Sequence, residues 1–238
     1  MKITVVELEV QGPLIFVKEQ YSVKDSTLAP SPLMRTSIFL HNYPFFYGLM
    51  GVSSEKIVSE TGQPEYTLVK EAVKEKIIYI YPPKPESVKI GKVFLAARGD
   101  TLFDLRPKME KVFPMQVFYY TILPGSKYIT AIVHDDDFTL PPYIRIGKKR
   151  WGIIRLKELP VREYEKIEPK YSTIPVNIGD LKDFNIKILD YNSVLITRNY
   201  PYIGEKAVIA YAKCEPTHRV KYIKGGKERT LYIPLIWI

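Results

Sequence analysis

Apolar and polar residues alternate with a period of two over much of the 238-residue chain, which is typical of β-strands that bury one face. Runs of this kind, separated by Gly and Pro, predict strands over 1–9, 14–18, 77–81, 92–98, 115–123, 128–134, 143–147, 150–157, 173–178, 184–189, 193–198, 207–214, 219–224 and 229–238. Because few helical patterns lie among them, the sequence favours the α+β class, with antiparallel sheets covered by few helices.

One stretch, Ser31–Gly51, breaks the alternation because it is apolar almost without interruption. It opens with a serine that can cap a helix and a proline suited to the first helical position, and it ends on glycine. The pattern therefore predicts a buried helix. Pro44 removes one helical hydrogen bond, which predicts a kink near Asn42. Arg35, His41 and Asn42 would then gather at the bend, or His41 and Asn42 would merely satisfy backbone groups that the proline frees.

Turn residues divide the rest of the chain. Pro124-Gly125-Ser126 predicts a hairpin between the strands on either side, and Gly225-Gly226 predicts a second hairpin, because glycine supplies the positive φ values that such turns need. The proline-rich residues 82–87 are predicted to be a stiff connector. A helix is predicted to begin at Pro64. No internal repeat or low-complexity tail interrupts this order.

Composition narrows the class of protein. The chain is 46% hydrophobic and 26% charged, has one cysteine (Cys214), and has no apolar run near the roughly 20 residues of a membrane span. We therefore expect a cytoplasmic protein without disulfides and without membrane contact. Scarce Asn, Gln, Cys and Met beside abundant Tyr, Pro, Lys and Glu are compatible with a heat-adapted, archaeal or thermophilic source.

The positive charge is concentrated in two windows. Tyr143–Lys157 has six basic residues and no acid, and Arg219–Arg229 has five basic residues and one acid, in a chain of net charge +9. Two basic strand-and-turn segments suggest a polyanionic partner. Solvated hairpin tips on a basic protein are the alternative.

Candidate chemistry is sparse. The three histidines lie far apart in sequence, and no phosphate loop, nucleophile elbow or zinc signature is present, so no cofactor is predicted. His134–Asp137 has the side chains for a hard cation, although an acidic hairpin tip or a contact to a basic partner is the interpretation we favour. Basic residues interleaved with aromatics in Ala97–Pro114 and Lys148–Trp151 suit a nucleic-acid surface.

Several short motifs resemble one known family. Leu40-His41-Asn42-Tyr43 followed by Tyr47 and Leu49, the strand ending in YPPKP, the basic segment IRIGKKRWGIIRLK and the glycine hairpin near the C-terminus are similar to the type I-D version of the Cas-five family. That family belongs to the RAMP superfamily of CRISPR-associated proteins. The resemblance spans most of the chain.

The resemblance implies a fold, a role and partners. The fold would be one ferredoxin-like (RRM-type) RAMP domain over residues 1–238, with a β-hairpin thumb inserted within residues 88–133. The protein would be a non-catalytic subunit of a type I-D Cascade complex in antiviral defence, binding the 5′ handle of crRNA beside the large subunit and the backbone subunit, near the PAM of target DNA. The residues expected to contact RNA are Arg35, His41, Asn42, Tyr43, Arg98, Arg106, Lys108, Lys148, Lys149, Arg150, Trp151, Lys224, Lys227 and Arg229.

Two other functions stay open from the sequence. Another branch of the family cuts repeat RNA with a tyrosine, a lysine and a histidine, so a metal-independent endoribonuclease is the first alternative. A β-rich protein-interaction module without nucleic acid is the second. Salt distinguishes the second from RNA binding, because phosphate contacts weaken steeply as ionic strength rises.

Overall fold

The computed structural model describes residues 2–15, 17–20, 34–51, 71–72, 74–75, 77–97, 115–147, 152–197 and 207–236. Within these ranges the strands form four separate sheets that are almost entirely antiparallel, and the two helices with complete bounds are both short. The coarse prediction of antiparallel sheets with few helices is therefore confirmed. No helix in the described part is long and apolar enough to cross a membrane.

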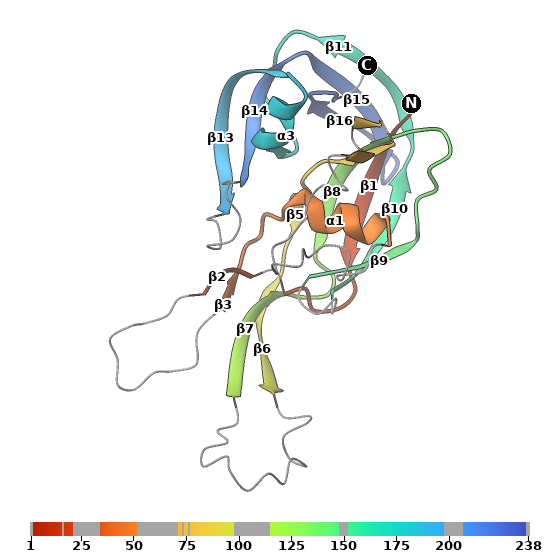
Figure 1. Cartoon of the computed structure of the whole chain (residues 1–238). Coiled ribbons are helices and arrows are strands. Elements are labelled where there is room, and N and C mark those ends of the chain that lie inside the picture. The colour runs from red at the N-terminus through yellow and green to blue at the C-terminus, as the bar shows by residue number, and fades with distance from the viewer. Residues whose placement is uncertain are drawn as a thin grey trace, which may run out of the picture.

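The largest sheet has the strand order β4-β8-β1-β10-β9, with β5 also paired to β8. Its strands are β1 (Lys2–Val10), β4 (Ile78–Ile80), β5 (Lys84–Ser87), β8 (Lys127–His134), β9 (Tyr143–Ile146) and β10 (Gly152–Leu159). β1 lies between β8 and β10, and every residue from Ile3 to Leu8 in it is buried. This central sheet contributes more residues to the hydrophobic core than any of the other sheets, and the smaller sheets lie around it (Figure 1).

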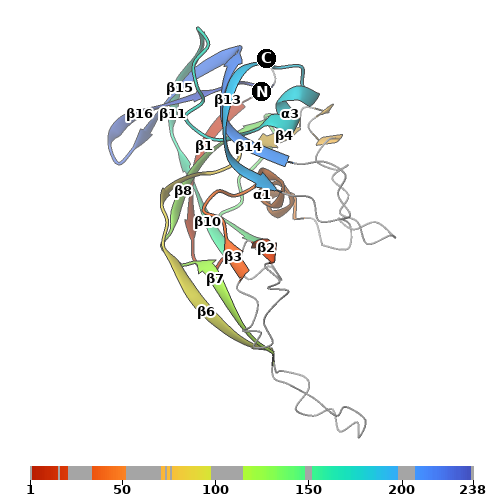
Figure 2. The ribbon, with the colours of Figure 1, turned by 90° about the vertical axis from the view of Figure 1, so that its left-hand side faces the viewer.

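Three smaller sheets surround the central one. β2 (Val17–Gln20), β3 (Met34–Thr36), β7 (Met115–Ile122) and β6 (Ile90–Ala97) form the first, β11 (Val161–Ile167), β15 (Thr217–Lys224) and β16 (Lys227–Ile233) the second, and β12 (Val176–Asn177), β14 (Ala207–Glu215) and β13 (Lys187–Thr197) the third. β6 and β7 project together from one end of the molecule, whereas the second sheet lies at the other end (Figures 1 and 2).

The long helix predicted for Ser31–Gly51 is wrong. Residues 34–36 are the strand β3, a turn follows in which Ser37 Oγ accepts from the Phe39 N–H, and α1 covers only Asn42–Leu49. The kink is also wrong, because Pro44 occupies the first helical turn, where its missing N–H has no intrahelical partner to lose. His41 is instead the N-cap residue.

Two further predictions are corrected. Residues 82–87 are not only a connector, because β5 pairs with β8 through Lys84 and Pro85 at the edge of the central sheet, the position in a sheet where proline is tolerated. The turn at Pro124–Ser126 does not form a hairpin, since β7 pairs with β6 in one sheet whereas β8 pairs with β1 in another. The chain changes sheets at this turn. The hairpin at Gly225-Gly226 is confirmed, with φ values of 58° and 74°.

α1 lies against one face of the central sheet through Gly48. A Cβ atom at Gly48 would lie 2.9 Å from Ile146 Cγ2 and 3.3 Å from Ile144 Cβ, so only a residue without a side chain allows this approach of helix to strand. The residues of β9 that face α1, Ile144 and Ile146, are buried, while Tyr143 and Arg145 are exposed. Tyr143 and Arg145 therefore lie on the face of the sheet opposite α1.

We expect Gly48→Ala to lower the free energy of unfolding by about 1–2 kcal/mol, because crowding at Ile146 outweighs the gain of roughly 1 kcal/mol in helix propensity. Gly179→Ala in α3 (Ile178–Asp183) is the matched control. Its added Cβ meets only an ordinary contact at 3.4 Å, so it should be neutral or slightly stabilising. Urea unfolding of both variants measures the difference, and equal effects would contradict the packing argument.

Candidate nucleic-acid interface

The polar residues of α1 belong to a buried network that joins α1 to α3. Asp180 of α3 is 4% exposed and accepts from Tyr43 Oη at 2.6 Å and Tyr79 Oη at 2.8 Å. It also accepts from Asn42 Nδ2 at 2.9 Å. Asn42 Oδ1 in turn accepts from Asn177 Nδ2 at 3.3 Å. Burial raises the pKa of the Asp180 carboxyl above its ordinary value, although the three hydrogen bonds that the carboxylate accepts act to lower the pKa. The network is saturated by protein groups, so it stabilises the fold.

His41 has a structural role as well. Its Nδ1 accepts from the Tyr43 N–H at 3.2 Å, which caps the N-terminus of α1, and its ring lies edge-on to that of Tyr43 at 4.5 Å. Removal from water lowers the pKa of His41 to about 4. A neutral imidazole with this pKa is a weak base, and its Nδ1 is occupied by the cap. His41 thus satisfies a backbone group, but that N–H belongs to the start of the helix and is not freed by Pro44. Asn42 bonds Asp180 and the Ile80 carbonyl instead of groups freed by the proline.

The basic residues of the C-terminal hairpin lie on its two opposite faces, because successive side chains of a strand alternate in direction. Tyr222 pairs with Arg229 and Lys224 with Lys227, so these four side chains share the inner face of the hairpin. Arg219 and Lys221 lie on the outer face, where they form ion pairs with Glu165 and Glu163 of β11. The window of five basic residues is therefore neutralised on one face and basic on the other.

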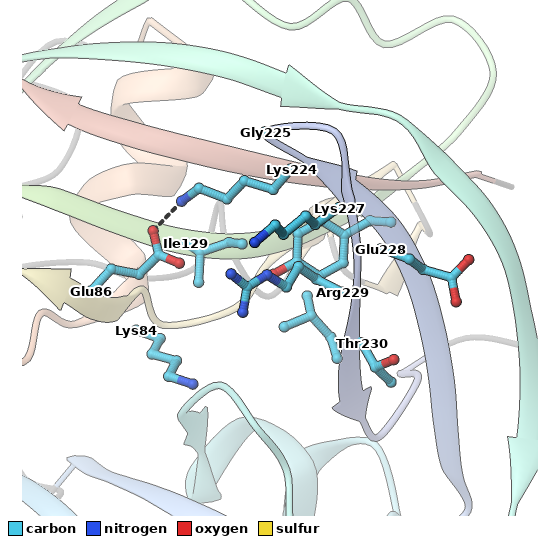
Figure 3. A pocket seen from close by; sticks show the side chains of 11 residues that line it. Lys84, Glu86, Ile129, Lys224, Gly225, Lys227, Glu228, Arg229 and Thr230 are labelled. Atoms are coloured by element: carbon cyan, nitrogen blue, oxygen red, sulfur yellow. Dashed lines mark hydrogen bonds and ion pairs between the residues drawn. The ribbon is translucent and has the colours of Figure 1, made fainter.

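A groove of about 650 Å³ lies between the inner face of this hairpin and the edge of the central sheet. Lys84, Lys224, Lys227 and Arg229 bring positive charge to it, and Tyr222 forms part of its wall. Figure 3 shows Lys224, Lys227 and Arg229 on the side of the hairpin that faces Glu86 and Lys84, with Glu228 pointing away. The groove therefore collects cations from segments about 140 residues apart in sequence (84 and 224).

Lys224 fixes the hairpin to the central sheet. Its ammonium pairs with Glu7 Oε2 of β1 at 2.6 Å and with Glu86 of β5. Burial raises the pKa of Glu7, but the hydrogen bond from Lys224 and the charges of Lys224, Lys127 and Lys157 outweigh it and lower the pKa below its ordinary value. Both carboxylates are thus satisfied by Lys224. Lys84, Lys227 and Arg229 have no ion pair with any described residue, which leaves their charge available to a ligand.

The groove continues onto the side of the central sheet opposite α1, here called the open face. Residues directly opposite one another in an antiparallel pair share a face, and the pairs Glu7↔Lys157, Glu9↔Arg155, Glu9↔Lys127, Ile129↔Lys84 and Tyr143↔Arg155 define it. The cations of this face are Lys84, Lys127, Arg145, Arg155 and Lys157. Its acids, Glu7 and Glu9, are paired with Lys224 and Arg155. The uncovered part of the central sheet is consequently basic.

The structure brings together only some of the predicted RNA contacts. Lys224, Lys227 and Arg229 meet at the groove, whereas His41, Asn42 and Tyr43 form the network and cap at α1. Arg35 belongs to β3. Arg98, Arg106, Lys108, Lys148, Lys149, Arg150 and Trp151 lie outside the described residues. The sequence pattern does not single out Lys84, because the proline-rich residues 82–87 predict a connector. The signal that could have found it is a lysine between two prolines beside a buried strand.

The acidic segment His134–Asp137 shows no cation-binding geometry. Asp135 Oδ1 accepts from the Phe138 N–H at 3.1 Å, Asp136 pairs with Lys2 at 3.5 Å, and His134 Nε2 lies 2.9 Å from Thr4 Oγ1. Across the described residues, no group of three His, Cys, Asp or Glu side chains is placed to hold a metal ion. The arrangement agrees with an acidic turn.

The family model of the type I-D CRISPR-associated protein Cas5/Csc1 matches residues 1–221 of the chain. The chain belongs to this family. The match covers all strands from β1 to β14 and most of β15, so the predicted resemblance is confirmed. The open face and Lys84 lie inside the matched range of this Cas5/Csc1 protein, and the tip of the C-terminal hairpin lies just beyond it.

Among solved structures, a chain in the cryo-EM structure of the type III-B Cmr-β complex bound to cognate target RNA is similar to this Cas5/Csc1 chain. The similarity has a TM-score of 0.43 and 11% sequence identity, and it covers 88% of this chain and 84% of that chain. No curated protein sequence matches the chain.

Proposed function

We propose that this Cas5/Csc1 protein is a non-catalytic, RNA-binding subunit of a type I-D CRISPR effector complex, with the 5′ handle of crRNA as its ligand. The observation that carries the proposal is the groove, where Lys84, Lys227 and Arg229 converge from two segments with no carboxylate neutralising them in the described part. Lysine and arginine neutralise RNA phosphates.

The same proposal includes the partners of the protein. Membership of a type I-D family supports assembly with the large subunit and the backbone subunit of that complex, close to the PAM of target DNA and in the cytoplasm. The projecting β6–β7 hairpin lies in the range expected for a thumb and suits a contact to a neighbour (Figure 2). We also propose that the central sheet is that of a ferredoxin-like RAMP domain.

The absence of catalysis is also a proposal. RNA cleavage through the 2′-OH needs a base of pKa near 7 beside a cation. His41 has its Nδ1 occupied by the helix cap and a pKa lowered to about 4, and His134 is bonded to Thr4. These two environments favour binding over endoribonuclease activity. Incubating the purified protein with repeat RNA and finding cleavage products would contradict this part.

The first test is recovery of bound RNA. Tagged protein purified from its native cell should carry RNAs that share one 5′ end sequence, together with the other complex subunits. Recovery of protein partners without RNA would contradict the proposal and support a protein-interaction module.

The groove itself is tested by replacing Lys227 and Arg229 together with alanine. We expect RNA binding to weaken roughly 10- to 100-fold, and the slope of log K against log salt to become shallower by about 1.4, because two phosphate contacts are lost. Arg219→Ala combined with Lys221→Ala is the matched control, since it removes the same charge from the outer face of the same hairpin. Fluorescence anisotropy measures both, and equal losses would show that only net charge matters.

A further inference from the structure

The open face has one feature that phosphate binding at the groove does not use. Tyr143 of β9 is 55% exposed, more than any other large apolar or aromatic side chain in the described part of the chain. Burying its ring would stabilise the protein, yet neither α1 nor the C-terminal hairpin covers it. An aromatic ring left in water on a basic sheet face is available to a ligand with its own flat apolar surface.

Two arginines flank Tyr143. Arg155 of β10 is its direct cross-strand partner, and Arg145 lies two residues further along β9 on the same face. Arg155 pairs with Glu9 through one nitrogen, which holds its side chain over the face and leaves other guanidinium donors for a ligand. Arg145 has no ion pair with any described residue. The ring therefore has two cationic neighbours, one across the strand pair and one along β9, whose Cα atoms lie about 5–7 Å from that of Tyr143.

The arginine pair is continuous with the groove. From β5 at the groove to β9 the strand order is β5-β8-β1-β10-β9, so four spacings of about 4.8 Å separate Lys84 from Tyr143, roughly 19 Å in all. Lys127 and Lys157 lie on the same face between these ends. The two acids of this stretch, Glu7 and Glu9, are held by Lys224 and Arg155. A row of cations thus crosses the sheet and ends at an exposed ring.

We propose that single-stranded RNA leaving the groove crosses the open face, and that Tyr143 stacks on one of its unpaired bases while Arg145 and Arg155 bind the adjacent phosphates. This inference rests on the proposed function and adds that the bound RNA is single-stranded and that Tyr143 selects it over a duplex. An aromatic ring stacks only on a base that is free of a duplex, whereas double-stranded RNA offers a sheet mainly phosphates and 2′-hydroxyls. Tyr143 therefore favours unpaired over paired RNA.

The test is the binding of a labelled oligouridine of about eight nucleotides to the full-length protein, measured by anisotropy. Tyr143→Ala should weaken binding roughly 5- to 150-fold without changing the salt slope, since stacking is lost and no phosphate contact is. Tyr143→Trp should retain or strengthen binding. Tyr164→Ala is the matched control, because Tyr164 is 50% exposed on β11. Binding of a blunt RNA duplex should be the same for Tyr143→Ala and the wild type.

The outcomes separate the two proposals. If Tyr143→Ala binds oligouridine as the wild type does while the Lys227/Arg229 double variant weakens, stacking is wrong and the groove stands. If the wild type binds no RNA, both proposals fail. If Tyr143→Ala leaves RNA binding intact but releases a subunit of the purified complex, Tyr143 contacts protein and the inference is overturned. An equal loss for Tyr164→Ala would also contradict it.

Discussion

Replacing Asp180 with alanine lowers the free energy of unfolding by about 3–5 kcal/mol, because the substitution removes an acceptor shared by the Tyr43 and Tyr79 hydroxyls and the Asn42 amide. Asn42 keeps its hydrogen bond to the Ile80 carbonyl, so the largest cost falls on the buried Tyr79 hydroxyl. Tyr79 is 1% exposed, so water does not replace the lost oxygen. The three donors come from α1 and β4, and Asp180 comes from α3, so each lost hydrogen bond joins residues more than 100 positions apart in sequence.

Chemical denaturation at pH 7 measures this effect. Asp137→Ala is the control, since Asp137 is an exposed carboxylate in the turn after β8, and its loss should change the free energy of unfolding by less than about 0.5 kcal/mol. Asp180→Asn keeps one acceptor oxygen and should fall between the two. A loss below 1 kcal/mol for Asp180→Ala would mean that the network relaxes, and that α1 and α3 are held together by apolar packing alone.

Acid weakens the fold through His41. Its pKa is lowered by burial to about 4 in the folded protein against 6.5 when free, so the unfolded chain binds more protons between these values. The stability that neutral His41 provides is complete above pH 6.5 and is lost as the pH falls toward 4. The loss amounts to about 2 kcal/mol at pH 5 and about 3 kcal/mol at pH 4.

His41→Ser isolates this contribution. Serine retains an N-cap oxygen for the Tyr43 N–H but does not titrate, so the variant should match the wild type within about 1 kcal/mol at pH 7.5 and become the more stable protein below pH 5. His218, whose pKa is also lowered by burial, is common to both proteins and cancels in the comparison. Unfolding curves that stay parallel from pH 7.5 to pH 4 would contradict a neutral, partly buried His41.

The strands with the clearest alternation or apolar runs were predictable from sequence. β1, β4, β8 and β15 appear within one or two residues of their predicted bounds, whereas β16 starts two residues early and ends at Ile233, five residues before the predicted end. Period-two patterns and paired glycines are local signals, which is why these strands could be found. The partners of these strands were not predictable. Pro124-Gly125-Ser126 has the composition of a hairpin turn, yet the strands that it joins lie in different sheets, which depends on distant partners such as β1 and β6.

For a similar reason, the sequence predicts the basic hairpin of the candidate site but not which of its residues face the groove. The basic window near the C-terminus indicated an anionic ligand, but only the register shows that Lys227 and Arg229 face the groove while Arg219 and Lys221 face glutamates. The position of Lys84 at the groove depends on the pairing of β5 with β8, and the prolines of β5 make that strand hard to recognise from composition. The apolar pattern of Ser31–Gly51 misled because it runs across the strand β3, a turn and α1, and not along one helix.

The length of the two-glycine turn determines which charged side chains of the hairpin face the groove. Successive side chains of a strand point to opposite faces, so one residue inserted beside Gly225 would rotate everything in β16 by one position relative to β15. Glu228, whose carboxylate now points away from the groove, would then point into it, and Lys227 and Arg229 would point away. The same amino acids would make a repulsive surface for phosphate, which means that the sign of this site is encoded in the length of a turn rather than in the composition of its strands.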